Sequence, residues 1–94
     1  MNIYERALRT WGIDAQLGMV IEECAELIKA INKHWRGKGT KEELIEECVD
    51  VELMICQMRE LFKDEGNTWD RIKIEKVERL NTLLKACPPP KGGE

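Results

Sequence analysis

The segment IEECAEL at residues 21–27 is followed by a close repeat, IEECVDV, at residues 45–51. Each segment carries two acidic side chains spaced three residues apart, Glu23 with Glu26 and Glu47 with Asp50. Residues at this spacing lie on one side of an α-helix, with about 5–6 Å between their Cβ atoms. Two such helices packed side by side would bring four carboxylates to one point, where a divalent cation relieves their repulsion. The repeat therefore predicts two neighbouring helices with a metal ion between them.

Helical signals extend outward from this repeat over nearly the whole chain. Apolar spacing and glycine breaks predict helices at residues 2–10, 14–35, 40–64 and 67–86, with no strand between them. Thr40 and Glu43 match a capping box at the third helix, and Asn67 or Thr68 is expected to cap the fourth. The short connections predict an all-α, antiparallel four-helix bundle-like domain over residues 1–87, which oligomerises through its long central helices. Residues 88–94, which begin with three prolines, are predicted to form a disordered tail.

Composition and charge narrow the class of protein. The 94 residues correspond to one small domain, and the net charge of −3 offers no general attraction to nucleic acid or to an anionic membrane. No apolar run approaches membrane-spanning length. The four cysteines form no CxxC pair and His34 is the single histidine, which disfavours a zinc site. Cysteines that stay as free thiols are typical of a reducing compartment, so the predicted location is cytoplasmic.

The third predicted helix is apolar on two sides. One stripe contains Leu44, Cys48, Val51, Met54, Ile55, Met58, Leu61 and Phe62. The second stripe contains Ile45, Val49, Leu53 and Cys56. A helix with two apolar sides must be covered on both, and four helices of this length give limited cover. Self-association through this helix is therefore predicted.

The acidic residues have two interpretations. A single EExxE pattern is usually a solvated helix face, but here Glu47 and Asp50 lie along the edge of an apolar stripe, where an unpaired carboxylate is costly. The two acidic segments are also separated by about one helical hairpin, which brings them to similar heights on neighbouring helices. Neither segment has the histidines of a di-iron site, and no calcium-loop pattern is present. The favoured ligand is Mg²⁺, with Mn²⁺ as a substitute, and its usual bridging to phosphate oxygens predicts nucleotide hydrolysis.

The pattern Glu22-Glu23-x-x-Glu26, followed by Glu47-x-x-Asp50, resembles the signature of the MazG-type nucleoside triphosphate pyrophosphohydrolases, an all-α family. Residues 16–50 carry the resemblance, and the order of four helices extends it to about residue 86. The resemblance implies cleavage between the α- and β-phosphates of a nucleoside or deoxynucleoside triphosphate, and a dimer or dimer of dimers.

Roles for individual acidic residues follow from this resemblance. It implies that Glu23, Glu26, Glu47 and Asp50 are the Mg²⁺ ligands. Glu22 would bind a further metal ion or orient the attacking water. Glu46 is a weaker candidate for the same role, with a surface position as the equal alternative.

Basic, polar and aromatic residues supply the predicted substrate contacts. On the fourth helix, Lys73, Lys76 and Arg79 are expected to stabilise the leaving pyrophosphate, or else to pack their stems on the core with the charged groups in solvent. Gln16 is a candidate for reading a base edge, with an ordinary exposed glutamine as the alternative. The end of the second helix offers further candidates: Lys33, Trp35, Arg36 and Lys38. Trp35 is expected either to stack a base or to close the end of the bundle, whereas Trp11 and Trp69 are expected in the core.

Two other functions remain open at this point. One is a non-catalytic helical oligomer that binds metal or nucleotide as a regulatory interaction module. The other is a purely structural helical dimer, in which the carboxylates have no ligand.

Overall fold

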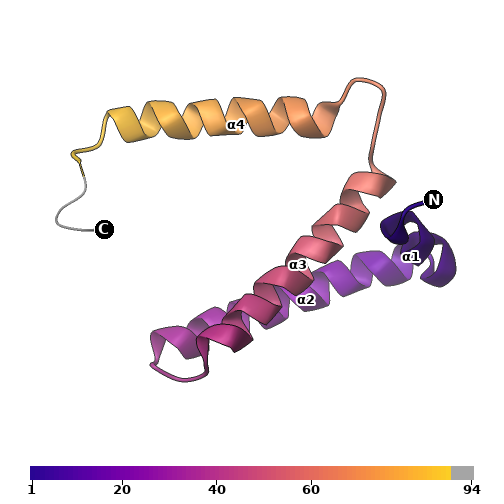
Figure 1. Cartoon of the computed structure of the whole chain (residues 1–94), viewed down its shortest axis with the longest axis horizontal. Helices are drawn as coiled ribbons and strands as arrows, with labels where there is room; N and C mark the ends of the chain where they lie inside the picture. Colours follow the sequence, from indigo (N-terminus) through magenta and orange to yellow (C-terminus); the bar gives the residue numbers. More distant parts are fainter. Residues whose placement is uncertain (90–94) are drawn as a thin grey trace. The chain divides into compact units, whose positions relative to one another are not determined.

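The computed structural model describes residues 1–89 and shows four α-helices, with no strand among these residues (Figure 1). The helices are α1 (Ile3–Trp11), α2 (Ile13–Trp35), α3 (Lys41–Leu61) and α4 (Thr68–Lys85). The predicted all-α class and the order of the helices are confirmed. Pro88 and Pro89 lie outside the helices, and the rest of the predicted disordered tail, residues 90–94, lies outside the described residues.

Glycines and side-chain caps separate the first three helices, as the sequence predicts. Gly12, between α1 and α2, has a φ of 90°, a backbone angle that residues with a Cβ atom rarely adopt. Gly37 and Gly39, with φ of 71° and 75°, end α2 and turn the chain toward α3. The Thr40 hydroxyl then accepts a hydrogen bond of 3.1 Å from the Glu43 backbone N–H, which caps the first turn of α3.

The connection between α3 and α4 differs from the prediction. The third helix ends at Leu61 instead of near Asp64, because Asp64 caps the next helix. Its carboxylate accepts hydrogen bonds from the Thr68 N–H at 2.9 Å and from the Thr68 hydroxyl at 2.5 Å. Asn67, one of the two residues predicted to cap α4, has left-handed backbone angles and makes no side-chain capping bond.

Because Asp64 caps α4, we expect the stability of the first turn of this helix to depend on pH. The hydrogen bonds from the Thr68 side chain and backbone lower the pKa of Asp64. A carboxyl whose pKa is lowered by folding stabilises the folded state fully above its unfolded pKa of about 3.9, and this contribution is lost as pH falls through the folded value. We expect protection of the Thr68 amide against hydrogen exchange to decline over that acidic range.

Replacing Asp64 with alanine should remove that pH dependence and lower the protection of the Thr68 amide at neutral pH. Glu65→Ala, a substitution of the exposed neighbouring carboxylate, is the matched control and should leave both unchanged. Equal protection in Asp64→Ala and in the native chain would show that the cap does not stabilise the helix.

The residues divide into two units, Met1–Phe62 with α1 to α3, and the part from Lys63 onward with α4. In the first unit, α2 and α3 form a helical hairpin joined by residues 36–40, and α1 packs against both helices (Figure 1). Its small apolar core contains Leu8, Met54 and Met58. The predictions of a single domain over residues 1–87 and of a four-helix bundle that includes α4 stay predictions.

Apolar side chains remain open to solvent on every helix. On α3, the first stripe contributes the buried Met54 and Met58, whereas Ile45, Val49 and Leu53 of the second stripe are 44–49% exposed. On α4, the apolar stripe is also exposed, at Ile72, Val77, Leu80, Leu83 and Leu84. None of the described helices combines the length and apolar character needed to cross a membrane.

Candidate metal centre and its flanking pockets

Three carboxylates from the two repeated segments meet in the hairpin. Glu23 of α2 faces Glu47 and Asp50 of α3, and one oxygen from each lies within 4.8 Å of the others. Glu47 and Asp50 are three residues apart on one helix, and packing of α2 on α3 adds Glu23 from across the hairpin. Glu23 and Glu47 are half-buried, whereas Asp50 is exposed. The cluster is therefore reachable from solvent on one side.

The carboxylates of the cluster repel one another when no cation is bound between them. Burial raises the pKa of Glu23, and the neighbouring charges of Asp50 and Glu47, followed by Glu26 and Glu22, raise it further. Both causes disfavour the charged form of the side chain. A bound cation would reverse this preference because it stabilises the carboxylates against each other.

The donor set fits a hard divalent cation. All three donors are carboxylate oxygens, which suit Mg²⁺ or Mn²⁺ and not the softer metals that prefer thiolates. Neighbouring oxygens bound to one octahedral Mg²⁺ at about 2.1 Å are about 3 Å apart, so the three groups, which lie within 4.8 Å of one another, would close by up to about 2 Å. Three protein ligands would leave positions for water and for phosphate oxygens.

The other three predicted acidic residues lie around this cluster and not in it. Glu22 is exposed on α2. Glu26, predicted as a fourth ligand, is exposed one turn further along α2 and lines a pocket together with Glu46 and Glu47. Among the described residues, the closest carboxylate group therefore contains three of the four predicted ligands.

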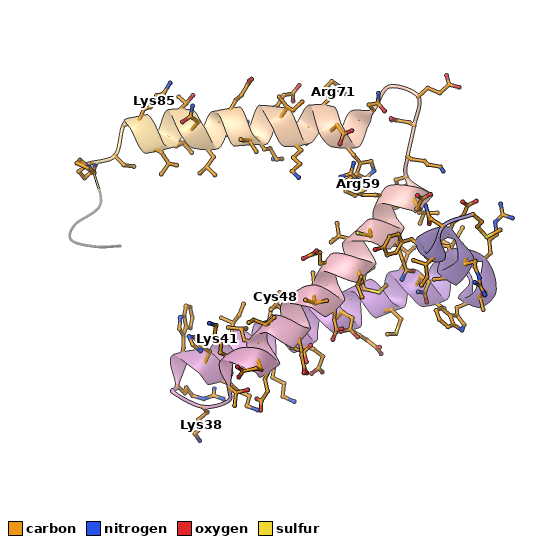
Figure 2. The ribbon with its side chains drawn as sticks, in the orientation of Figure 1. Lys38, Lys41, Cys48, Arg59, Arg71 and Lys85 are labelled. Carbon is orange, nitrogen blue, oxygen red and sulfur yellow. The ribbon has the colours of Figure 1, made fainter. Side chains whose placement is uncertain are left out.

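That pocket, here called the lysine pocket, lies between the last turns of α2 and the first turns of α3 and has a volume of about 280 Å³. Its basic side chains are Lys29, Lys33, His34 and Lys38. Its carboxylates are Glu26, Glu43, Glu46 and Glu47. Lys38 projects from the turn that joins the two helices (Figure 2). Because Glu47 belongs to both groups, the lysine pocket directly adjoins the carboxylate cluster.

The lysines in this pocket have no fixed partner. Within residues 1–89, no ion pair joins Lys29, Lys33 or Lys38 to a carboxylate. Their charges are available to an anion that enters the pocket. Of the three, Lys29 was not among the predicted substrate contacts, although its spacing from Glu26 and Lys33 places all three on one helix face.

A second hollow, here called the aromatic groove, lies between α1 and α3. It has a volume of about 640 Å³ and is lined by Ile3, Tyr4, Arg6, Ala7, Thr10, Trp11, Leu53 and Gln57. Trp11 is 64% exposed, so the prediction that it belongs to the core is wrong. The helical spacing places Trp11 on the same side of α1 as Tyr4, but only the packing of α1 beside α3 produces a groove there.

Gln16 is buried and not placed to read a base edge directly. Its side chain is 5% exposed and its amide nitrogen donates a hydrogen bond of 2.6 Å to the amide oxygen of Gln57. Gln57, at 8% exposed, is the residue of this pair that lines the aromatic groove. The sequence offered a polar residue among apolar ones in each helix, but the pairing of the two needs the tertiary contact.

The remaining predicted substrate contacts lie outside these two hollows. Trp35 is 80% exposed at the last residue of α2, and Arg36 follows it as the C-cap. On α4, in the second unit, Lys73, Lys76 and Arg79 are exposed. Trp69, predicted in the core, is half-buried at the start of that helix.

The resemblance to the MazG-type pyrophosphohydrolases depends on two acidic segments that lie on neighbouring helices. The hairpin of α2 and α3 has this arrangement, with Glu23 facing Glu47 and Asp50. No protein-family model, curated protein or solved structure matches the chain.

Proposed function

We propose that the protein is a Mg²⁺-dependent nucleoside triphosphate pyrophosphohydrolase of the MazG type, which acts on a nucleoside or deoxynucleoside triphosphate. One observation carries the proposal: a cluster of three carboxylates adjoins a pocket with three unpaired lysines. Carboxylates coordinate the cation that accompanies a triphosphate, and lysines bind the phosphate oxygens of the triphosphate. A solvated acidic face would not require this juxtaposition.

In the proposed reaction, a water oxygen forms a bond to the α-phosphorus, and the bond from that phosphorus to the bridging oxygen breaks. The products are a nucleoside monophosphate and pyrophosphate. Glu23, Glu47 and Asp50 would hold Mg²⁺, which supplies charge neutralisation on the phosphate oxygens and a position for the water. Glu26, which lines the lysine pocket together with Glu47, is the proposed fourth ligand.

The water must be held in line with the leaving group, and a carboxylate can accept its proton. Glu22 and Glu46 are the proposed residues for this task, because each precedes a ligand and is exposed. Glu46 has the stronger structural support, because it lines the lysine pocket beside Glu47.

The lysine pocket supplies cations that would stabilise the leaving group. Charge accumulates on the pyrophosphate as the bond breaks, and fixed cations next to it lower the barrier. Lys29, Lys33 and Lys38 belong to the same unit as the carboxylates, which supports them in this role. Lys73, Lys76 and Arg79 of α4 stay predicted for the same role.

The direct test is an assay of the purified chain with Mg²⁺ and a panel of nucleoside and deoxynucleoside triphosphates. Equal amounts of monophosphate and pyrophosphate are expected from at least one substrate. Release of orthophosphate would place cleavage at another bond. Nucleotide binding without turnover of any member would support the regulatory module in place of the enzyme.

We predict that Lys33→Ala raises the KM for the triphosphate about tenfold and weakens product inhibition by pyrophosphate to a similar extent. Lys33 is half-buried in the lysine pocket, where a charge-assisted hydrogen bond to phosphate contributes about 1.5–3 kcal/mol. Steady-state kinetics with added pyrophosphate measure both effects. Lys85→Ala, at the end of α4, is the matched control. Unchanged pyrophosphate inhibition in Lys33→Ala would remove this residue from the phosphate site.

We further propose that the active protein is a homodimer or homotetramer. In support, the second apolar stripe of α3 is open to solvent, and the buried apolar core of the first unit contains only three side chains among the described residues. Burial of Ile45 and Val49 against another copy would stabilise both copies. We also propose a reducing, cytoplasmic location, which is supported by the four free thiols.

A further inference from the structure

The two hollows and the carboxylate cluster follow one face of α3 in a fixed order. Glu46, Asp50, Leu53 and Gln57 are spaced by four, three and four residues, so they share one side of the helix. Glu46 lines the lysine pocket, Asp50 belongs to the carboxylate cluster, and Leu53 and Gln57 line the aromatic groove. At 1.5 Å per residue, this face extends about 16 Å from Glu46 to Gln57. That length suits an extended nucleoside triphosphate.

The aromatic groove has the chemistry of a nucleoside site. Tyr4 and Trp11 offer ring faces, Leu53 offers an apolar wall, and a nucleobase stacks on such surfaces with little sequence preference. The volume of about 640 Å³ lies in the ordinary range for small-molecule sites. Arg6 also lines the groove and adds a cation that can stack on a base or contact a ribose oxygen.

Gln57 supplies a polar group of the kind that distinguishes one base from another. Its amide oxygen accepts from Gln16, and its amide nitrogen contacts the Met54 sulfur at 3.7 Å, a weak acceptor. An amide nitrogen carries two N–H donors, and within residues 1–89 no other acceptor takes the second one. Gln57 lines the groove, its side chain is 8% exposed, and the bond from Gln16 fixes its amide group.

We infer that the aromatic groove binds the nucleoside of the substrate, so that the triphosphate runs along α3 toward the lysine pocket. This inference rests on the proposed function, because the proposed hydrolysis places the α-phosphate at the carboxylate cluster. The base stacks on Trp11 and Tyr4, and Gln57 donates a hydrogen bond to an acceptor on its edge. The terminal phosphates then reach Lys33 and Lys38.

A second copy of the chain is the other candidate occupant. The open stripe that favours self-association has its centre at Val49, on a neighbouring face of α3, and Leu53 lies at the border between the two faces. The groove also contains Arg6 and the spare donor of Gln57, which an apolar helix face would leave unpaired. The order of groove, cluster and pocket along one helix favours the nucleotide.

The first experiment compares Trp11→Ala with Ile13→Ala. Trp11 is 64% exposed and Ile13 is 50% exposed, so both truncations spare the core, and Ile13 does not line the groove. We expect Trp11→Ala to raise the KM for the triphosphate about tenfold, the loss typical of one base stacked on one aromatic ring. Inhibition by inorganic pyrophosphate should be unchanged in both variants, and Ile13→Ala should have the native KM.

Two outcomes of this comparison would overturn the inference. If Trp11→Ala weakens inhibition by pyrophosphate as much as it weakens binding of the triphosphate, Trp11 does not contact the nucleoside. If light scattering shows that Trp11→Ala dissociates the oligomer while Ile13→Ala does not, a second copy of the chain occupies the groove.

The second experiment uses three proteins that each retain one tryptophan, Trp11, Trp35 or Trp69, with phenylalanine at the other two positions. Nucleoside monophosphates are titrated with Mg²⁺, and tryptophan fluorescence is recorded. Quenching confined to the protein that retains Trp11 supports the nucleoside site. Quenching confined to Trp35 or Trp69 overturns it.

The fluorescence result separates this inference from the proposed function. Turnover of triphosphates without quenching of Trp11 would support the proposed hydrolase and contradict the nucleoside site in the groove. Quenching of Trp11 without turnover of any triphosphate would support the nucleoside site and contradict the proposed hydrolase.

Discussion

Replacement of Glu47 by glutamine is expected to lower kcat/KM for the triphosphate about a thousandfold, with the helical fold retained. Glu47 is the half-buried member of the carboxylate cluster on α3, and it also lines the lysine pocket. The neutral amide binds Mg²⁺ weakly and removes one negative charge from the centre that holds the phosphate chain. A thousandfold loss corresponds to about 4 kcal/mol of transition-state stabilisation.

The same variant should behave differently from the native protein in thermal unfolding. Without metal, Glu47→Gln is expected to unfold at a higher temperature, because one source of the repulsion that raises the pKa of Glu23 is gone. With Mg²⁺ at about a hundred times its Kd, the native protein gains about 2.7 kcal/mol, and the variant should gain much less. A structural dimer without a ligand would show the first effect and no loss of function.

Glu42→Gln is the matched control for both measurements, because Glu42 is an exposed glutamate in the first turn of the same helix and does not line the pocket. Asp50→Asn provides a second test of the cluster and should also abolish turnover. Native kcat/KM in both Glu47→Gln and Asp50→Asn would show that the cluster is not the site of catalysis.

Replacement of Val49 by glutamate should dissociate the oligomer, with at least a hundredfold rise in the dissociation constant. Val49 is 44% exposed and lies between Ile45 and Leu53 along the open stripe of α3. A carboxylate placed there would lose its water in the interface without gaining a partner, which costs at least about 3 kcal/mol. Sedimentation or light scattering across a range of protein concentrations measures the change.

The stability of Val49→Glu should also depend on protein concentration less steeply than that of the native chain, because a raised dissociation constant weakens the coupling between folding and association. Lys41→Glu is the control: it adds negative charge to the first turn of α3, at an exposed position outside the stripe. An unchanged molecular mass in Val49→Glu would mean that the open stripe of α3 is not the contact between copies.

Much of the local structure follows from the amino-acid sequence. The positive φ values at Gly12, Gly37 and Gly39, and the cap of α3 by Thr40, depend on residues close together in the chain. For this reason, the boundaries of the first two helices and the start of the third agree with the prediction to within one residue. The end of α3 was missed because Asp64 can either extend one helix or cap the next, and only its bonds to Thr68 decide between these.

The spacing of Glu47 and Asp50 within one helix, and the recurrence of the pattern around Glu23, sufficed to predict that these carboxylates meet. The neighbours of a helix face, however, cannot be obtained from periodicity, because periodicity gives the direction of a side chain and not what lies opposite. The packing of α1 beside α3 therefore decided that Trp11 lines a groove. The contact of Gln16 with Gln57, and the gathering of Lys29, Lys33 and Lys38 beside Glu47, likewise required the tertiary structure.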